Sequence, residues 1–108
     1  MANARRSNRT EAALDALSEP TRRRVLELLR DGERSVRELT DDMRITQPAV
    51  SQHLRVLREA GLVSVRPLGA RRLYRIDQNG FAAVRSWVDG FWDGALAAFV
   101  EHVEKDQT

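Results

Sequence analysis

The sequence contains no cysteine, which removes several kinds of chemistry at once. Without thiols the chain cannot form disulfides, bind metals or iron–sulfur clusters through thiolates, or use a cysteine nucleophile. It also lacks long apolar runs. The first ten residues, MANARRSNRT, have no hydrophobic core of the length that a secretion signal needs, and no later stretch matches a membrane span. These absences predict a cytoplasmic protein that is not attached to a membrane.

Catalytic motifs are missing as well. There is no glycine-rich phosphate-binding loop, and Ser51 and His53 lie two positions apart in a predicted helix. Side chains at that spacing point about 200° apart, so these two residues cannot act together as nucleophile and base. The sequence therefore predicts a protein that is not an enzyme and uses no cofactor.

Positive charge is concentrated in one part of the chain. The 108 residues have a net charge of only +2, but residues 44–75 contain seven arginines and one acid, Glu59, which gives that segment +6. Residues 1–43 are neutral, and residues 76–108 carry −4. A basic block of this kind is typical of a surface that binds a polyanion such as nucleic acid. A solvated charged face without a ligand is the alternative.

The length predicts one domain with a modest hydrophobic core, which a second subunit would stabilise further. We divide the chain into a flexible basic arm (1–9), a folded domain (10–104) and a short tail (105–108). Helical patterns cover residues 10–17, the segment from Pro20 to Gly32, and SVRELTDDM (35–43). In the last of these, Ser35 and Glu38 have the spacing of a capping box. Three helices are therefore expected before residue 44.

A fourth helix is predicted over residues 47–60, after a tight connection. Thr46 can cap its start, Pro48 fits its first turn, where a missing N–H has no cost, and Gly61 follows its end. Three apolar residues fall within about 60° of one another on a helical wheel and predict a buried stripe. They are Val50, Leu54 and Leu57.

The opposite side of this helix is small and polar at its N-terminal end. Ala49 and Ser51 permit close approach, and Gln47 and Gln52 can hydrogen-bond to base edges. Two helices joined by a short turn, the second presenting such a surface, are typical of a helix-turn-helix that enters the DNA major groove. For His53 two roles are open, a hydrogen bond to a phosphate or one to the neighbouring helix. The predicted DNA-reading residues are Thr46, Gln47, Ala49, Ser51, Gln52, His53 and Arg55.

A basic β-hairpin follows the fourth helix. LVSVRP (62–67) and RRLYRI (71–76) alternate as strands and are joined by a turn at Gly69. Directly after a recognition helix, such a hairpin is typical of a wing that follows the phosphate backbone or reaches the minor groove. The DNA contacts predicted on it are Arg66, Arg71, Arg72 and Tyr74.

The last helix is predicted over FAAVRSWVDGFWDGALAAFVEHV (81–103), and its apolar band is too wide for one core-facing side. The core of one protomer can cover only part of such a band. The remaining apolar side therefore predicts contact with a second subunit. Aromatic residues at helical spacing favour an interface, and a small-ligand pocket is the alternative. The interface residues predicted on this helix are Trp87, Phe91, Trp92, Ala95 and Phe99.

In these features the chain resembles winged helix-turn-helix repressors of the ArsR family. The similarity is carried by LSEPTRRRVLELL (17–29), TQPAVSQHLRVLREAGLV (46–63), the hairpin RPLGARRLYRI (66–76) and FWDGALAAF (91–99). It implies a mainly α fold with a small β-hairpin, in the order α-α-α-α-β-β-α. It also implies a homodimer formed by the first and last helices, with Leu14 and Leu17 in the interface. Such a dimer would bind a palindromic double-stranded DNA operator and repress transcription, its own promoter included.

Metal-sensing members of that family use cysteines in the helix before the recognition helix, or paired Asp and His ligands on the last helix. This chain has no cysteine, and its last helix has one histidine, His102, near Glu101 and Asp106. Because zinc or nickel needs three or four ligands, we expect no metal site and place the chain in a cysteine-free, autoregulator-like branch. The alternatives are a winged-helix module that binds protein, and a ligand- or metal-responsive repressor with a non-cysteine site. A small-molecule inducer stays an open possibility.

Overall fold

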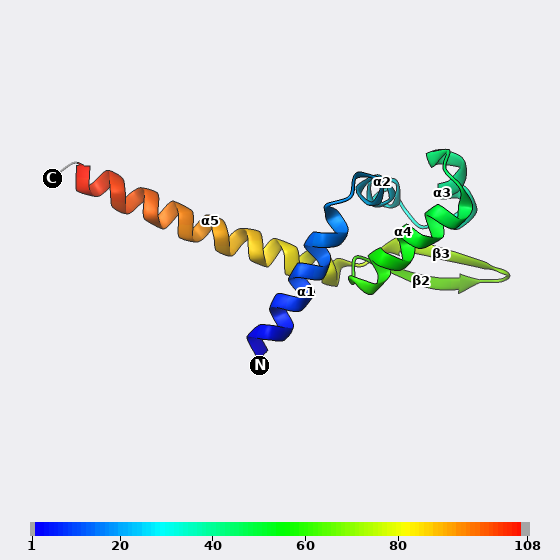
Figure 1. The fold of residues 1–108 in the computed structure, drawn as a ribbon, viewed down its shortest axis with the longest axis horizontal. Coiled ribbons are helices and arrows are strands. Elements are labelled where there is room, and N and C mark those ends of the chain that lie inside the picture. The colour runs from blue at the N-terminus through cyan, green and yellow to red at the C-terminus, as the bar shows by residue number, and fades with distance from the viewer. Residues whose placement is uncertain (1, 107–108) are drawn as a thin grey trace.

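The computed structural model describes residues 2–106, with the side chains of residues 8–105, and has a winged helix-turn-helix fold (Figure 1). Four helices and a small antiparallel sheet share one core, and the long last helix leads away from it. The predicted fold class, mainly α with a small hairpin, is confirmed. The elements are α1 (Ala2–Leu17), α2 (Pro20–Leu29), β1 (Arg34–Ser35), α3 (Val36–Met43), α4 (Gln47–Glu59), β2 (Val63–Leu68), β3 (Arg71–Ile76) and α5 (Gln78–Asp106).

The sheet has one strand more than the sequence predicted. The short β1 pairs with β3, so that the strand order is β1-β3-β2 and both pairings are antiparallel. Arg34 lies opposite Tyr74, and Ser35 lies opposite Leu73. A strand of two residues has no periodicity that a sequence pattern can detect. Its pairing matters because it attaches the start of α3 directly to the hairpin.

Both terminal helices are longer than predicted. α1 begins at Ala2 rather than at Thr10, because residues 2–9 contain no proline or glycine that would interrupt a helix. Most of the expected arm 1–9 therefore belongs to a helix. α5 begins at Gln78 and continues to Asp106, into the segment expected to be a tail. Residues 1, 107 and 108 lie outside the described part of the chain.

The helix ends around α3 and α4 follow the predicted signals. Ser35 and Glu38 form the reciprocal capping box at the start of α3. Thr46 caps α4 by accepting the N–H of Ala49 at 3.3 Å, and Gly61 follows the end of α4 with a φ of 77°. These caps satisfy N–H groups that a helix start leaves without a backbone partner, and they fix where each helix begins.

The core lies between α1, α2, α3, α4 and the base of the hairpin. The stripe predicted on α4 is buried, since Val50, Leu54 and Leu57 are at most 1% exposed. Each such side chain stabilises the fold by roughly 1.5–3 kcal/mol. α1 contributes the buried alanines Ala13 and Ala16, whose small side chains let this helix pack closely. The other apolar core residues are Val25, Leu26, Leu29, Leu39, Leu62, Val63 and Leu73.

The first turn of α5 packs tightly against the turn that ends α4. Gly80 is buried, and a Cβ atom at this position would clash with the carbonyl of Gly61. Just before α5, Asp77 donates its N–H to the carbonyl of Leu62, and its carboxylate accepts the N–H of Asn79, both at 2.9 Å. The start of α5 is therefore held in a defined position relative to α4.

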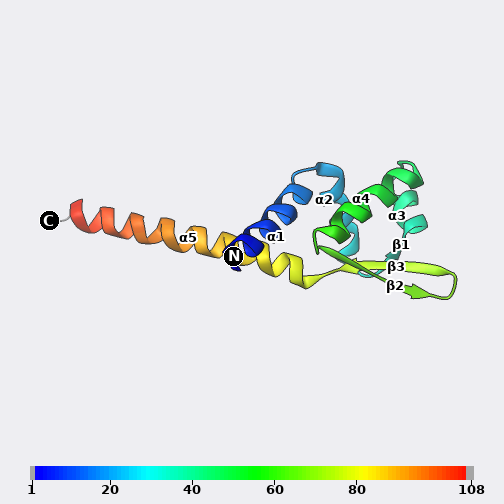
Figure 2. The same cartoon turned by 60° about the horizontal axis from the view of Figure 1, so that its bottom comes forward.

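α5 continues far beyond the core, and α1 crosses it near its start (Figures 1 and 2). In the first turns of α5, Phe81 and Val84 pack against the core. Six large apolar residues further along the helix are at least half exposed, so a single protomer leaves an apolar helix face uncovered. They are Trp87, Phe91, Trp92, Leu96, Phe99 and Val100.

Candidate nucleic-acid interface

The connection between α3 and α4 is short and sharply turned. Arg44 has a left-handed conformation, with a φ of 58°, and donates its N–H to the carbonyl of Thr40 at 3.0 Å. A residue other than glycine is uncommon in this region of the backbone map. The turn allows α4 to start with Thr46 as N-cap while it packs against α3. The chain thus forms the helix-turn-helix that the sequence predicted.

The first turns of α4 present unpaired polar groups. Among the described residues, the side chains of Gln47, Ser51 and Gln52 have no hydrogen-bond partner, so their donors and acceptors are available to base edges. Arg55 forms an ion pair with Glu59 at 3.3 Å, and such an exposed pair is weak. Five of the seven predicted DNA-reading residues are exposed, namely Thr46, Gln47, Ser51, Gln52 and Arg55.

The other two predicted DNA-reading residues, Ala49 and His53, are half-buried. Nδ1 of His53 lies 3.9 Å from Oε2 of Glu19, which is the N-cap of α2. This nitrogen is buried and has no hydrogen-bond partner within the described part of the chain. Of the two roles considered for His53, the structure places the side chain against the neighbouring helix. A contact with a phosphate remains a prediction.

The wing carries its arginines on two faces. Because successive side chains of a strand point to opposite faces, Arg66 and Arg71 share one face, whereas Arg72 lies on the other, across from Pro67. Arg72 has no ion pair with another described residue. The fourth predicted wing residue, Tyr74, is half-buried against the core and belongs to the base of the hairpin.

Arg66 and Arg71 both pair with acids outside the wing. Nε of Arg66 lies 2.7 Å from Oε2 of Glu33, and Nη2 of Arg71 lies 2.6 Å from Oε1 of Glu38. In both pairs the partners are 33 positions apart in the sequence. The sequence prediction missed both pairings, since it placed Glu38 only in the capping box of the third helix. The wing therefore offers less uncompensated charge than its arginine count indicates.

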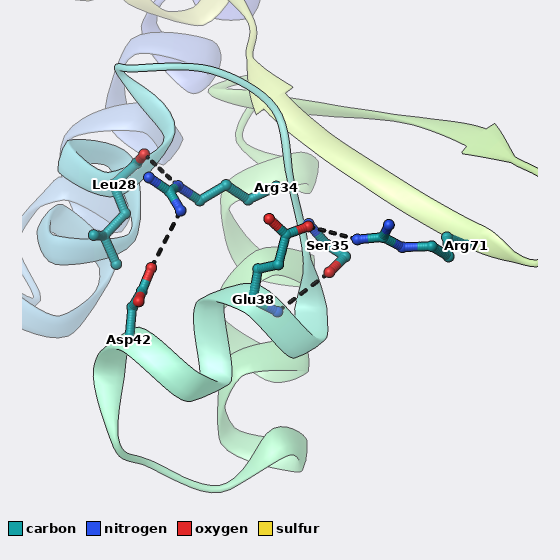
Figure 3. Close-up of polar contacts among 6 residues, drawn as sticks. All are labelled: Leu28, Arg34, Ser35, Glu38, Asp42 and Arg71. Carbon is teal, nitrogen blue, oxygen red and sulfur yellow. Dashed lines mark hydrogen bonds and ion pairs between the residues drawn. The ribbon is translucent and has the colours of Figure 1, made fainter.

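Glu38 joins the wing to the start of α3 (Figure 3). The oxygen that accepts the hydrogen bond from Arg71 also accepts the N–H of Ser35 at 3.2 Å. The hydroxyl of Ser35 accepts the N–H of Glu38 at 3.2 Å, which completes the capping box. One carboxylate thus performs a local function in a helix cap and a long-range function at the wing.

A second arginine in the same region ties α2 to α3 (Figure 3). Nε of Arg34, on β1, donates to the carbonyl of Leu28 at 3.0 Å, and its Nη1 lies 3.2 Å from Oδ2 of Asp42. Since β1 also pairs with β3, these contacts connect α2, α3 and the wing. The helix-turn-helix and the wing are therefore held together by polar contacts as well as by the core.

The ion pairs of the wing change the pKa values of their members. The hydrogen bond from Arg66 lowers the pKa of Glu33, and Glu33 in turn raises the pKa of Arg66. For Glu38, the hydrogen bonds with the backbone and side chain of Ser35 are the main causes of a lowered pKa, and the charge of Arg71 adds a smaller effect. Both carboxylates are therefore stabilised in their charged form.

The apolar surface of α5 is continuous in the protomer. The rings of Trp87 and Phe91 stack with their centroids 6.1 Å apart, and Phe91 meets Trp92 edge-on at 5.9 Å. On α1, Leu14 is half-buried, and Leu17 packs against the protomer's own core. The interface residues predicted on α5 are all exposed, namely Trp87, Phe91, Trp92, Ala95 and Phe99.

The described residues form neither a metal site nor a membrane span. In that part of the chain, no group of three His, Asp or Glu side chains could hold a metal ion. His102, which the sequence suggested as a possible ligand, is exposed on α5. None of the described helices combines the length and apolarity that crossing a bilayer requires.

Sequence comparison assigns the helix-turn-helix to a known family. Residues 19–65, from the N-cap of α2 into β2, match the model of the bacterial regulatory proteins of the ArsR family. The chain is 43% identical to the HTH-type transcriptional regulator Rv2034 of Mycobacterium tuberculosis over 96 residues, which cover 89% of this chain and 90% of that protein.

Solved structures give the same result. A crystal structure of a possible transcriptional regulator for arsenical resistance is 44% identical, with a TM-score of 0.68 over 80% of this chain and 94% of that one. The homodimeric winged helix-turn-helix DNA-binding domain of Mb0332 from Mycobacterium bovis is 29% identical, with a TM-score of 0.70 over 87% of each chain. The family is one of regulators rather than of enzymes. The chain therefore belongs to the ArsR family of winged helix-turn-helix transcriptional regulators.

Proposed function

We propose that the protein is a sequence-specific transcriptional repressor, which binds a palindromic DNA operator as a homodimer and includes its own promoter among its targets. The observation that carries this proposal is the exposed start of α4, where Gln47, Ser51 and Gln52 have no partner among the described residues. Unpaired amide and hydroxyl groups at the start of a helix fit direct reading of bases in a major groove.

The wing supplies the complementary, sequence-independent part of binding. Arginine side chains hold phosphates through forked hydrogen bonds, which position a protein on DNA without reading the sequence. Arg72 is the strongest candidate for this role because no acid neutralises it among the described residues. Arg66 and Arg71 would have to exchange their carboxylate partners for phosphates.

The homodimer accounts for the uncovered surface of α5. Its aromatic residues are more than half exposed in the protomer, and large apolar patches of this kind mark interaction sites. The similar domain of Mb0332 is described as homodimeric. A two-fold dimer would present two copies of α4 to successive major grooves, with half-sites about 10 base pairs apart or a small multiple of that spacing.

A winged-helix module that binds protein is the rival function, because a fold does not fix its function. The polar start of α4 and the arginines of the wing favour DNA over a protein partner, since protein interfaces have an apolar centre. As a DNA-binding regulator the protein would work in the cytoplasm.

Selection of bound sequences from random DNA tests the proposal. We expect enrichment of a palindrome, and we expect sedimentation to give a dimer at micromolar concentration. If no sequence is enriched while the protein sediments as a folded dimer, sequence-specific DNA binding is refuted and the protein-binding function gains support. A folded monomer would refute the homodimer.

A further inference from the structure

A cavity of about 520 Å³ lies where three elements meet, on a part of the surface that the proposed DNA contacts do not use. Its walls come from α1, from the turn that ends α4 and from the start of α5. The volume falls in the range of about 300–1,000 Å³ that is typical of small-molecule sites. Small residues line its apolar part, among them Ala12, Gly61 and Gly80.

The charged groups of this cavity have opposite signs and come from different walls. Arg9 is supplied by α1, whereas the acids Glu59 and Asp77 are supplied by the end of α4 and the residue before α5. A guanidinium binds a carboxylate through two parallel hydrogen bonds, and carboxylates bind an ammonium group. We propose that the cavity binds a small zwitterion of the amino-acid class, whose carboxylate meets Arg9 and whose ammonium group meets the acids.

The side chain of such a ligand would lie on the small residues that line the cavity. Gly61 and Gly80 are in such close contact that a Cβ at Gly80 would clash, so the wall of the cavity at this point is backbone without side chains. The methyl groups of Ala12, Ala60 and Ala83 also line the cavity, and an apolar group is stabilised when it leaves water to contact them. The cavity thus combines charged groups of both signs with small lining residues, which together fit a ligand that carries both charges and an apolar side chain.

The dimer surface leaves this cavity open on the α1 side. At about 100° per residue, Arg9 and Ala12 lie about 140–160° around α1 from Leu14, one of the two residues of α1 predicted for the dimer contact. The other, Leu17, packs against the protomer's own core. A partner subunit that packs on Leu14 would therefore approach the opposite side of the helix. The site is distinct from both proposed macromolecular contacts.

Ligand binding at this position would influence DNA binding. Glu59 and Gly61 lie at the end of α4, and the DNA-reading residues lie at the other end of the same 13-residue helix. A helix of that length is a rod of about 20 Å, so a small change in angle at one end displaces the other. Ligand and DNA would then favour different orientations of α4, which is the condition for coupling. This coupling rests on the proposed DNA-binding function, whereas ligand binding itself does not.

Titration of the full chain with L-phenylalanine, followed by NMR, tests the site. The expected result is a saturable change in the amide signals of Gly61 and Gly80. L-phenylalaninamide lacks the carboxylate and N-acetyl-L-phenylalanine lacks the ammonium group, so each should bind about tenfold more weakly. Unchanged glycine signals, or equal changes with all three compounds, would overturn the proposal.

Two substitutions test whether the charged side chains of the cavity bind the ligand. Arg9→Gln and Glu59→Gln should each weaken phenylalanine binding about tenfold. The matched control is Arg85→Gln, which removes an exposed charge on α5 whose partner is Asp89. If Arg9→Gln and Glu59→Gln bind like the control, the cavity does not recognise a zwitterion in this way.

A measurement of DNA affinity separates the two proposals. In the unaltered protein, saturating phenylalanine should change operator affinity at least about fivefold, and Arg9→Gln should abolish that change while binding DNA normally in its absence. Operator binding without any effect of a bound ligand would refute the coupling and leave the repressor function intact. Absence of operator binding with normal phenylalanine binding would refute the repressor function alone.

Discussion

Oε1 of Glu38 lies 2.6 Å from Nη2 of Arg71 and 3.2 Å from the backbone nitrogen of Ser35. One carboxylate therefore stabilises the start of α3 and at the same time neutralises an arginine of the wing. Phosphates of DNA would compete with this carboxylate for the same guanidinium. The affinity of the wing for DNA then depends on an acid that makes no DNA contact itself.

Removing the charge of Glu38 should strengthen DNA binding. Glu38→Gln keeps a side chain that can complete a capping box, so the loss of stability should stay below ~1 kcal/mol, but Arg71 is released. Affinity for operator and for random DNA should rise, and the slope of log affinity against log salt should steepen by up to ~0.9 per subunit. Fluorescence anisotropy at several salt concentrations measures both. Glu27→Gln, which removes the exposed partner of Arg24 on α2, is the control, and equal behaviour of the two variants would contradict this prediction.

The wing arginines should differ in their contributions. Arg71→Ala and Arg72→Ala should each weaken binding to operator and random DNA alike, because phosphate contacts carry no sequence information. Arg72→Ala should have the larger effect, with a salt slope reduced by ~0.9 per subunit and roughly twice that per dimer. The same anisotropy titrations apply, with Arg85→Ala on α5 as control. Unchanged slopes in both wing variants would remove the wing from the DNA interface.

The polar residues at the start of α4 should control the preference for operator over random DNA and not the affinity for DNA in general. Gln52→Ala or Ser51→Ala should reduce the preference for operator by ~1–3 kcal/mol per disrupted base contact and leave binding to random DNA nearly unchanged. Competition between operator and random duplexes gives this difference directly. Equal losses on both DNAs would show that these residues do not read bases.

The aromatic surface of α5 should control assembly. Phe91→Ala or Trp92→Ala should cost on the order of 3–5 kcal/mol if the ring is buried in a packed dimer contact. In the protomer these rings are 60% and 56% exposed, so the cost should appear in dimerisation, with DNA affinity falling as a consequence. Sedimentation and thermal melting over a range of protein concentrations measure it. Dimers with unchanged melting temperature in both variants would mean that the rings face solvent or a ligand.

The free energy of unfolding should decrease at low pH, because Glu33 and Glu38, which pair with arginines of the wing, become protonated. Their pKa values are lowered in the folded protein, so the stability they contribute is fully present above the pKa of the unfolded chain and is lost as the pH falls through the folded values. Both side chains are exposed, and the effect should therefore be modest. Thermal melting between about pH 3 and pH 7 should show less acid sensitivity in the double variant Glu33→Gln, Glu38→Gln than in the unaltered protein. Identical pH profiles would contradict the expected linkage.

Local signals explain why most of the fold could be predicted from the sequence. Pro48, the N-cap Thr46 and the capping box at Ser35 act within one helical turn, so a short stretch of sequence contains the whole cause. The buried stripe of α4 depends on spacing alone. The same reasoning located the exposed polar positions of α4, because a residue opposite a buried stripe faces outward.

Long-range contacts explain what the sequence did not reveal. β1 exists because Arg34 and Ser35 meet residues of β3 that come much later in the chain. The neutralisation of Arg66 by Glu33 likewise joins positions 33 apart, and a charge count by segment assigned the two residues to different blocks. At the helix ends, the absence of a stop signal let α1 extend to Ala2, whereas the pattern of apolar residues had suggested a later start.

The crossing of α1 and α5 also has a consequence for the order of events during synthesis. α1 leaves the ribosome before α5, against which it packs, because it comes earlier in the chain. The residues between them can form the helix-turn-helix and wing while α5 is still being translated. The surface proposed for pairing is thus completed only after α5 has been translated. We expect this timing to protect half-made chains from premature association on crowded polysomes.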